Sequence, residues 1–374
     1  MKTYRQSLDE LHFTREEKNA MADRLTAGES RGGGKVRSIR RTVAVGVAAA
    51  LLMTMGVGAA VTLTPAGEVF ASVFGGAPAQ TEIMDRMGVP IGASDTSGGV
   101  TITADAIIGD TYSYAVVYSI ARDDGQPLAE DLTPLGGGDG PLPLTFDQAD
   151  TDIGMLGGSH GTAYFYDADP ADNAIQYVEM MTADTPIEPG TATATFQNLY
   201  LRGEDIQDRA LLAEGSWKIR FQFQFPDSGV SLEAGQTFQL NGMEATLDGV
   251  TISPLSIQVG YTVWEELVWD HQDQADGQMS EHDREQSYRF FESLPVTVNF
   301  TDGTALDLSG NGGGIRPEDG KTVCQKGRVF EEILDLSTVE SVTVGDVTLP
   351  VEAEYFRNQP RGGGSPASQA VEKV

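Results

Sequence analysis

The feature that most constrains this chain is a run without a charged side chain, from Thr42 to Thr64. As an α-helix this run would be about 34 Å long, which is enough to cross a hydrocarbon layer of about 30 Å. Pro65 and Gly67 follow the run and are typical residues at the end of a helix. The pattern predicts one transmembrane helix over residues 42–64.

Two other interpretations of the run stay open. A helix buried in a soluble core is disfavoured, because the run is long and apolar on every face. A cleaved signal peptide could use the small residues Val57-Gly58-Ala59 as its cleavage site. However, a charged segment of 41 residues precedes the run, and signal peptides usually have a much shorter one.

Charge differs strongly between the two sides of the run. Residues 1–41 hold ten Lys and Arg and six Asp and Glu, which leaves 15 basic and 49 acidic residues after the run. Positively charged flanks stay in the cytoplasm, so we expect a cytoplasmic N-terminus and extracellular C-terminal domains in the cell membrane. The basic residues expected to set this topology are Lys35, Arg37, Arg40 and Arg41.

Composition excludes several kinds of function. The acidic part repels phosphate backbones, so direct binding of nucleic acid is not expected. The single cysteine, Cys324, excludes an internal disulfide and a cysteine-based zinc site. We predict that Cys324 is a small buried residue, with a reactive thiol as the alternative. No metal and no cofactor are expected.

Residues 1–41 are too few to form a hydrophobic core of their own, yet they carry signals for helices. Ser7–Glu10 and Thr14–Glu17 both match the capping box S/T-x-x-E. Short isolated helices are marginal in water, so we expect this segment to fold on a partner. The alternative is an unstructured tail that only sets the topology. The expected partner-binding face consists of Leu8, Leu11, Phe13, Met21 and Leu25.

Beyond the span, the sequence pattern changes from helix to strand. Residues 65–91 predict a short juxtamembrane helix and a linker. WKIRFQFQF, residues 217–225, alternates between apolar and polar side chains, as a half-buried strand does. In TYSYAVVYSI, residues 111–120, the alternate residues from Tyr112 to Ile120 share one face. Asp302-Gly303 and Gly345-Asp346 predict two hairpin turns.

Strands of this length with frequent turns are typical of β-sandwiches. We predict a first β-sandwich domain over 92–227 and a second over 228–355, followed by a disordered tail over 356–374. The predicted fold class is therefore mainly β, with a short N-terminal helical segment, one transmembrane helix and two β-sandwich ectodomains.

Several segments in this order carry a resemblance to a known family. They are LDELHFTREEKNAM, a basic linker, an Ala-rich span, VFGG, GGVTITADAIIGDTYSYAVVYSI, GSWKIRFQF and TISPLSIQV. Over about residues 5–350 the chain resembles single-pass, anti-sigma-factor-like membrane proteins of Gram-positive bacteria. Their ectodomain starts with a domain of unknown function, and a second, Ig-like domain follows it.

The resemblance implies a tethered regulator. Its N-terminal segment would hold an extracytoplasmic-function sigma factor, and its Ig-like ectodomains would receive an envelope signal of unknown identity. The zinc-binding version of the anti-sigma domain carries one His and two Cys on its helices. In this chain His12 stands alone and Cys324 is far away, so that version is excluded.

Two glycine-rich motifs resemble catalytic ones without the structural setting that catalysis needs. GGSHG, residues 157–161, matches the nucleophile elbow G-x-S-x-G, but no buried strand precedes it and no helix pattern follows. GNGGGI, residues 310–315, lacks the Lys and Ser/Thr that end a phosphate-binding loop. We expect both to be loops, and we expect that the protein is not an enzyme.

Two further patterns have simple structural interpretations. The acidic clusters DADPADN and HQDQADGQMSEHD do not fit a calcium loop, although non-specific cation binding stays open. The aromatic strands are expected to be core, because a carbohydrate platform would need their rings on the solvent face.

The expected function is thus a membrane-anchored anti-sigma factor that binds its sigma factor in the cytoplasm. The alternative is a cell-surface Ig-like binding or structural protein without a cytoplasmic partner. An exported hydrolase is a third hypothesis.

Overall fold

The computed structural model describes residues 63–129, 132–134, 140–154, 158–203, 208–226, 228–270 and 279–352. The predicted cytoplasmic segment, the disordered tail and nearly all of the predicted span lie outside these residues. Among the described residues, no helix has both the length and the apolar character needed to cross a membrane.

Three short helices open the described part of the chain. They are α4 (Ala66–Val69), α5 (Ala71–Phe74) and α6 (Pro78–Met87). A break follows α5 because Gly75 has a φ of 98°, a conformation that glycine adopts without steric cost. The first strand then begins at Gly88, inside the region where the sequence predicted a linker.

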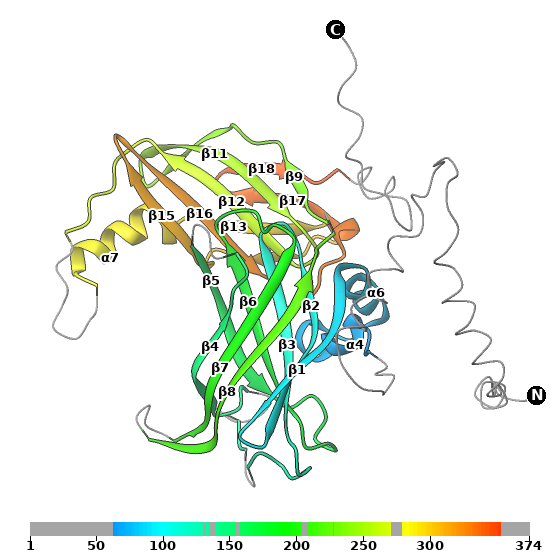
Figure 1. The fold of residues 1–374 in the computed structure, drawn as a ribbon. Coiled ribbons are helices and arrows are strands. Elements are labelled where there is room, and N and C mark those ends of the chain that lie inside the picture. The colour runs from blue at the N-terminus through cyan, green and yellow to red at the C-terminus, as the bar shows by residue number, and fades with distance from the viewer. Residues whose placement is uncertain are drawn as a thin grey trace, which may run out of the picture. The chain divides into compact units, whose positions relative to one another are not determined.

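Residues 88–223 form two antiparallel sheets, which we call the first sheet pair (Figure 1). The strand order is β1-β2-β3-β6-β5 in one sheet and β4-β7-β8 in the other. The strands are β1 (Gly88–Ser97), β2 (Val100–Gly109), β3 (Ser113–Arg122), β4 (Leu144–Thr151), β5 (Ser159–Tyr166), β6 (Ile175–Ala183), β7 (Gly190–Arg202) and β8 (Arg209–Phe223).

One apolar core joins the two sheets of the first pair. Trp217 of β8 is fully buried there, and its Nε1 donates a hydrogen bond of 2.9 Å to the carbonyl oxygen of Val100 in β2. The alternation predicted for residues 217–225 is confirmed over 217–223, where the apolar side chains are buried and the polar ones between them are exposed. Strand β8 ends at Phe223.

Strand β3 is buried on both faces. Tyr114, Val116 and Tyr118 lie in the core between the sheets, which confirms that they share a face. Ala115 and Val117 lie on the opposite face, in a different cluster that includes the helices. The sequence pattern described one face correctly but did not predict that the other face is covered.

Residues 230–350 form the second sheet pair. The strand order is β10-β11-β12-β16-β15 in one sheet, with β9 also paired to β11, and β14-β13-β17-β18 in the other. The strands are β9 (Val230–Leu232), β10 (Thr237–Leu240), β11 (Met243–Ile252), β12 (Ser256–Val263), β13 (Val296–Phe300), β14 (Ala305–Asp307), β15 (Gly313–Glu318), β16 (Lys321–Val329), β17 (Val339–Val344) and β18 (Val347–Pro350). The helices are α7 (Glu281–Ser287), a π-helix at Tyr288–Glu292 and a 3-10 turn at Leu336–Thr338.

A separate core lies within the second pair. The two predicted hairpins are confirmed, since β13 pairs with β14 and β17 pairs with β18. Cys324 is fully buried, as predicted, and burial raises the pKa of its thiol to about 12. The described fold is therefore mainly β and sandwich-like.

A buried cation connects parts of the second pair. Lys326 of β16 has 0% exposed surface, and its ammonium group donates to the carbonyl oxygens of Leu294 at 3.0 Å and Ser309 at 2.9 Å. The carbonyl oxygen of Glu292 lies at 3.4 Å, and the Phe291 ring centroid lies 4.9 Å from the same nitrogen. Burial lowers the pKa of this amine to about 8.

We expect Lys326→Met to lower the free energy of unfolding by about 3 kcal/mol at pH 7. The substitution leaves buried carbonyl groups without a donor, and each such group costs about 1–3 kcal/mol. Urea unfolding of the full chain measures the loss. Lys321→Met, at a partly exposed lysine on the same strand, is the matched control and is expected to change stability by less than about 0.5 kcal/mol.

The same variant gives a pH-dependent prediction. Between pH 8 and the ordinary lysine pKa of 10.5, the unfolded chain binds a proton at Lys326 that the folded chain has lost. Raising the pH through this window therefore increases the unfolding free energy of the wild type, by up to about 3 kcal/mol. Lys326→Met lacks this increase, so parallel pH curves for the two proteins would contradict the assignment.

Candidate functional site where the helices meet both sheet pairs

The three helices form a closely packed unit. The backbone N–H of Gly67 in α4 donates to Asp85 Oδ1 of α6 at 2.7 Å. A Cβ at Gly67 would lie 2.4 Å from the carbonyl oxygen of Thr81, so only glycine permits this approach. Phe70 and Phe74 are completely buried, and their ring centroids are 5.8 Å apart.

This unit covers the outer face of the first sheet. Figure 1 shows α4 and α6 beside β1 and β2, and both helices contact these strands. The shared apolar cluster contains helix residues together with alternate residues of three strands. The strand members are Ala106, Ile108, Ala115, Val117 and Val178.

The helices also contact the second sheet pair. Leu255, which precedes β12, and Ile333, which follows β16, belong to the same buried cluster as Phe70 and Phe74. The backbone N–H of Ile333 donates to the carbonyl oxygen of Phe74 at 3.2 Å. The segment that follows the predicted span is therefore packed against both sheet pairs, and we call this place the junction (residues 66–87, 110–113, 253–256 and 333).

One carboxylate at the junction accepts hydrogen bonds from both sheet pairs. Asp110 Oδ1 accepts hydrogen bonds from the backbone N–H groups of Tyr112 at 2.9 Å and Ser113 at 2.8 Å. Its Oδ2 accepts from the hydroxyl of Ser256 at 2.6 Å and from the hydroxyl of Ser253. Because the serines belong to the second sheet pair, one buried carboxylate links a turn of each pair.

The two glycine-rich motifs lie together at a further contact between the sheet pairs. His160 Nε2 lies 2.9 Å from the carbonyl oxygen of Gly327, and a Cβ at Gly312 would lie 2.9 Å from the His160 ring. The prediction that both motifs are loops was wrong in part, because β5 begins at Ser159 and β15 begins at Gly313. Glycine is needed at position 312 because a side chain there would approach the His160 ring too closely.

The geometry around Ser159 does not match a nucleophile elbow. Ser159 is exposed at the start of a strand on the edge of its sheet, with no strand-to-helix turn. Within the described ranges, no group of three or more His, Cys, Asp or Glu side chains could hold a metal ion.

Two carboxyl groups on strands of the first sheet pair have raised pKa values. Burial raises the pKa of Glu179, which accepts hydrogen bonds from the hydroxyls of Tyr114 at 2.7 Å and Thr151 at 2.9 Å. Burial also raises the pKa of Asp105 to about 6, although the Ser119 hydroxyl donates to it at 2.6 Å. In both cases the hydrogen-bond donors are hydroxyl groups of the same sheet pair. We therefore interpret both carboxyl groups as structural.

The partner-binding residues Leu8, Leu11, Phe13, Met21 and Leu25 and the basic residues Lys35, Arg37, Arg40 and Arg41 lie outside the described residues, so both assignments stay predictions. The junction was missed by sequence reasoning. One signal could have found it, since YAVVY at residues 114–118 is continuously apolar, and such strands are buried on both faces.

We expect Asp110→Ala and Ser256→Ala to be non-additive. Each single change removes the same hydrogen bond across the junction, so the double variant loses less than the sum, with a coupling energy of about 1 kcal/mol. Urea unfolding of the four proteins in this cycle measures it. Additive effects would show that the hydrogen bond between Asp110 and Ser256 does not stabilise the contact between the sheet pairs.

We expect Phe74→Ala to release the helices from the junction. Truncating a fully buried phenylalanine costs about 3–5 kcal/mol. Here the lost contacts belong to the small apolar cluster that holds the helices in place. Limited proteolysis of the full chain should then cut within residues 66–87 at least tenfold faster. Glu82→Ala, at an exposed position of α6, is the control and should leave the rate unchanged.

Comparisons with known proteins identify no family for this chain. No protein family model matches the chain, and no curated protein matches it either. A solved structure described as the crystal structure of the conserved domain protein from Bacillus anthracis is similar, with 15% identity and a TM-score of 0.43, over 69% of this chain and 76% of that chain. This similarity is too distant to support an argument about fold or function.

Proposed function

We propose that the protein is a membrane-anchored regulator, an anti-sigma factor that sequesters an extracytoplasmic-function sigma factor through its N-terminal segment. The observation that carries the proposal is the packing of residues 66–87 at the junction. This segment directly follows the predicted span. A change in how the sheet pairs contact each other would therefore act on the residues next to the membrane.

We also propose that both sheet pairs are Ig-like. In the first pair, β2-β3-β6-β5 and β4-β7-β8 have the order A-B-E-D and C-F-G. In the second pair, β11-β12-β16-β15 and β14-β13-β17-β18 have the order A-B-E-D and C′-C-F-G. An additional strand lies beside strand A in each case, β1 in one and β10 in the other, which supports a common architecture for the two.

The proposed mechanism needs no catalysis by the chain. The apolar face that includes Leu11 and Leu25 covers the surface by which the sigma factor would bind RNA polymerase. Signal reception outside the membrane changes the junction, and the tether is then cut or remodelled so that the sigma factor is released. The alternative is a cell-surface Ig-like binding or structural protein whose N-terminus only sets orientation.

Affinity purification of the full-length chain from its host distinguishes these two functions. We expect the wild type to retain a sigma factor, because its apolar face is intact, and the double variant Leu11→Asp/Leu25→Asp to lose it. Asn19→Asp adds an acidic residue two positions before Met21 and six before Leu25, spacings that lie off that face of a helix, and should retain the sigma factor.

The other outcomes have definite meanings. Retention by the double variant would show that the assigned face is wrong. Loss of the sigma factor from all three intact proteins would favour the cell-surface alternative.

A further inference from the structure

A hollow lies beside β11 in the second sheet pair, where the strand is irregular. The register between β11 and β12 shifts between Leu247 and Gly249, and such bulges often occur at functional sites. On its other edge, β11 pairs with β10 up to Thr246 and with β9 from Val250 onward. The hollow is shallow and open to solvent, with a volume of about 610 Å³.

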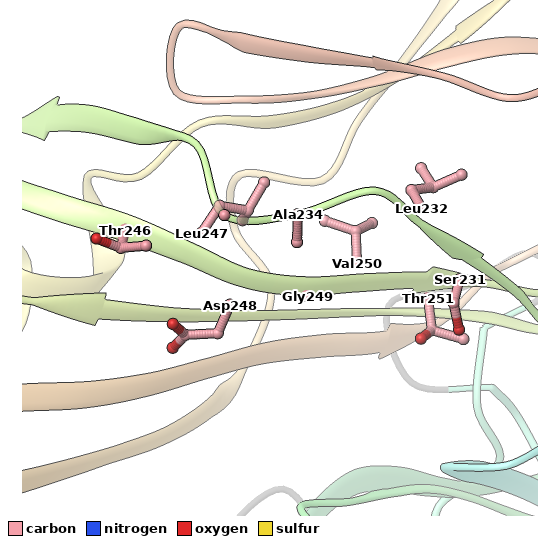
Figure 2. Close-up of a pocket in the computed structure, with 10 residues that line it drawn as sticks. Ser231, Leu232, Ala234, Thr246, Leu247, Asp248, Gly249, Val250 and Thr251 are labelled. Atoms are coloured by element: carbon pink, nitrogen blue, oxygen red, sulfur yellow. The ribbon is translucent and has the colours of Figure 1, made fainter. Parts of the chain in front are cut away.

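The wall of the hollow offers oxygen atoms for hydrogen bonding. Figure 2 shows the side chains of Ser231, Asp248 and Thr251 on one side of the strand and the apolar side chains of Leu247 and Val250 on the other. The residues that line the hollow include three hydroxyls and one carboxylate and no basic side chain. A ligand that fits this wall supplies hydroxyl donors and carries no negative charge.

The Asp248 carboxylate keeps acceptor capacity for a ligand. Its Oδ2 accepts a hydrogen bond of 2.8 Å from the hydroxyl of Thr262. A carboxylate has about four acceptor sites on its two oxygens, and hydrogen bonds to a charged acceptor are stronger than neutral ones. Thr262 orients the carboxylate, so the group is positioned before a ligand arrives.

An aromatic ring lies next to this polar wall. Trp264 follows β12 and is 51% exposed, which is unusual for so large an apolar side chain. Its Nε1 donates a hydrogen bond of 2.9 Å to the hydroxyl of Thr246, which lines the hollow. The bond restricts the rotation of the indole and ties the exposed ring to a residue that lines the hollow.

We propose that this hollow binds a neutral saccharide. A sugar ring has an apolar C–H face, which can stack on Trp264, and hydroxyl groups, which can bond to Asp248 and the neighbouring hydroxyls. The chain carries a net charge of −30, which disfavours anionic polymers. The site would supply the ligand class that the ectodomain senses in the proposed function. It rests on that proposal for its location outside the membrane.

Two glycines, Gly249 in the hollow and Gly310 outside it, provide a test variant and its matched control. A Cβ at Gly249 would meet no atom within 4 Å, and its φ is not in the left-handed region. A side chain at Gly249 therefore starts in open space, and we expect Gly249→Leu to obstruct part of the hollow. Gly310 has equally open surroundings outside the hollow, so Gly310→Leu is the matched control. Tyr288→Ala, at an aromatic residue 58% exposed, is the control for Trp264→Ala.

The test is calorimetric titration of the purified full chain, in a detergent without a sugar headgroup, with chitotetraose, cellotetraose and polygalacturonate. We expect one of the two neutral oligosaccharides to bind. Trp264→Ala should weaken this binding at least tenfold and Gly249→Leu should abolish it, whereas Tyr288→Ala and Gly310→Leu bind as the wild type does.

Several results would overturn the proposal. They are binding of neither neutral oligosaccharide, binding of polygalacturonate alone, and neutral binding that is unchanged in both Trp264→Ala and Gly249→Leu. Retention of the sigma factor is measured separately. If no saccharide binds but the sigma factor is retained, only the saccharide site is refuted. If saccharide binds but the sigma factor is not retained, only the anti-sigma function is refuted.

Discussion

Burial of the outer face of the first sheet is the interaction on which the rest of the described structure depends. Without α4 to α6, residues such as Ile108 and Val117 would face water, at a cost of about 25 cal/mol for each Å² of apolar surface. The cluster that covers this face also contains Leu255 and Ile333. Packing the helices against the sheet therefore also holds the second sheet pair in contact with the first.

Polar contacts at the junction act differently from this apolar cluster. Apolar burial is non-directional, whereas Asp110 accepts four hydrogen bonds from donors in defined positions. A buried carboxylate is costly unless its hydrogen bonds are made, so a shift between the sheet pairs would leave it unsatisfied. This dependence gives the contact between the sheet pairs one preferred geometry.

Sequence patterns predicted local structure well wherever one face of a strand was exposed. Residues 217–223 alternate between buried and exposed positions as expected, and both predicted hairpins formed. The expectation of loops failed at residues 159–161 and 313–315, which belong to β5 and β15. Gly161 and Gly313 there lie close to the backbone of neighbouring strands, and a local sequence pattern contains no information about such an approach.

The sequence by itself determined the mainly β fold class, the faces of the strongest strands and the burial of Cys324, because these follow from period-2 alternation and composition. The tertiary structure decided the burial of β3 on both faces, the convergence of Asp110 with Ser253 and Ser256, and the position of Trp264 beside a hollow. These features join residues that are distant along the chain, so they depend on the packing of the sheets.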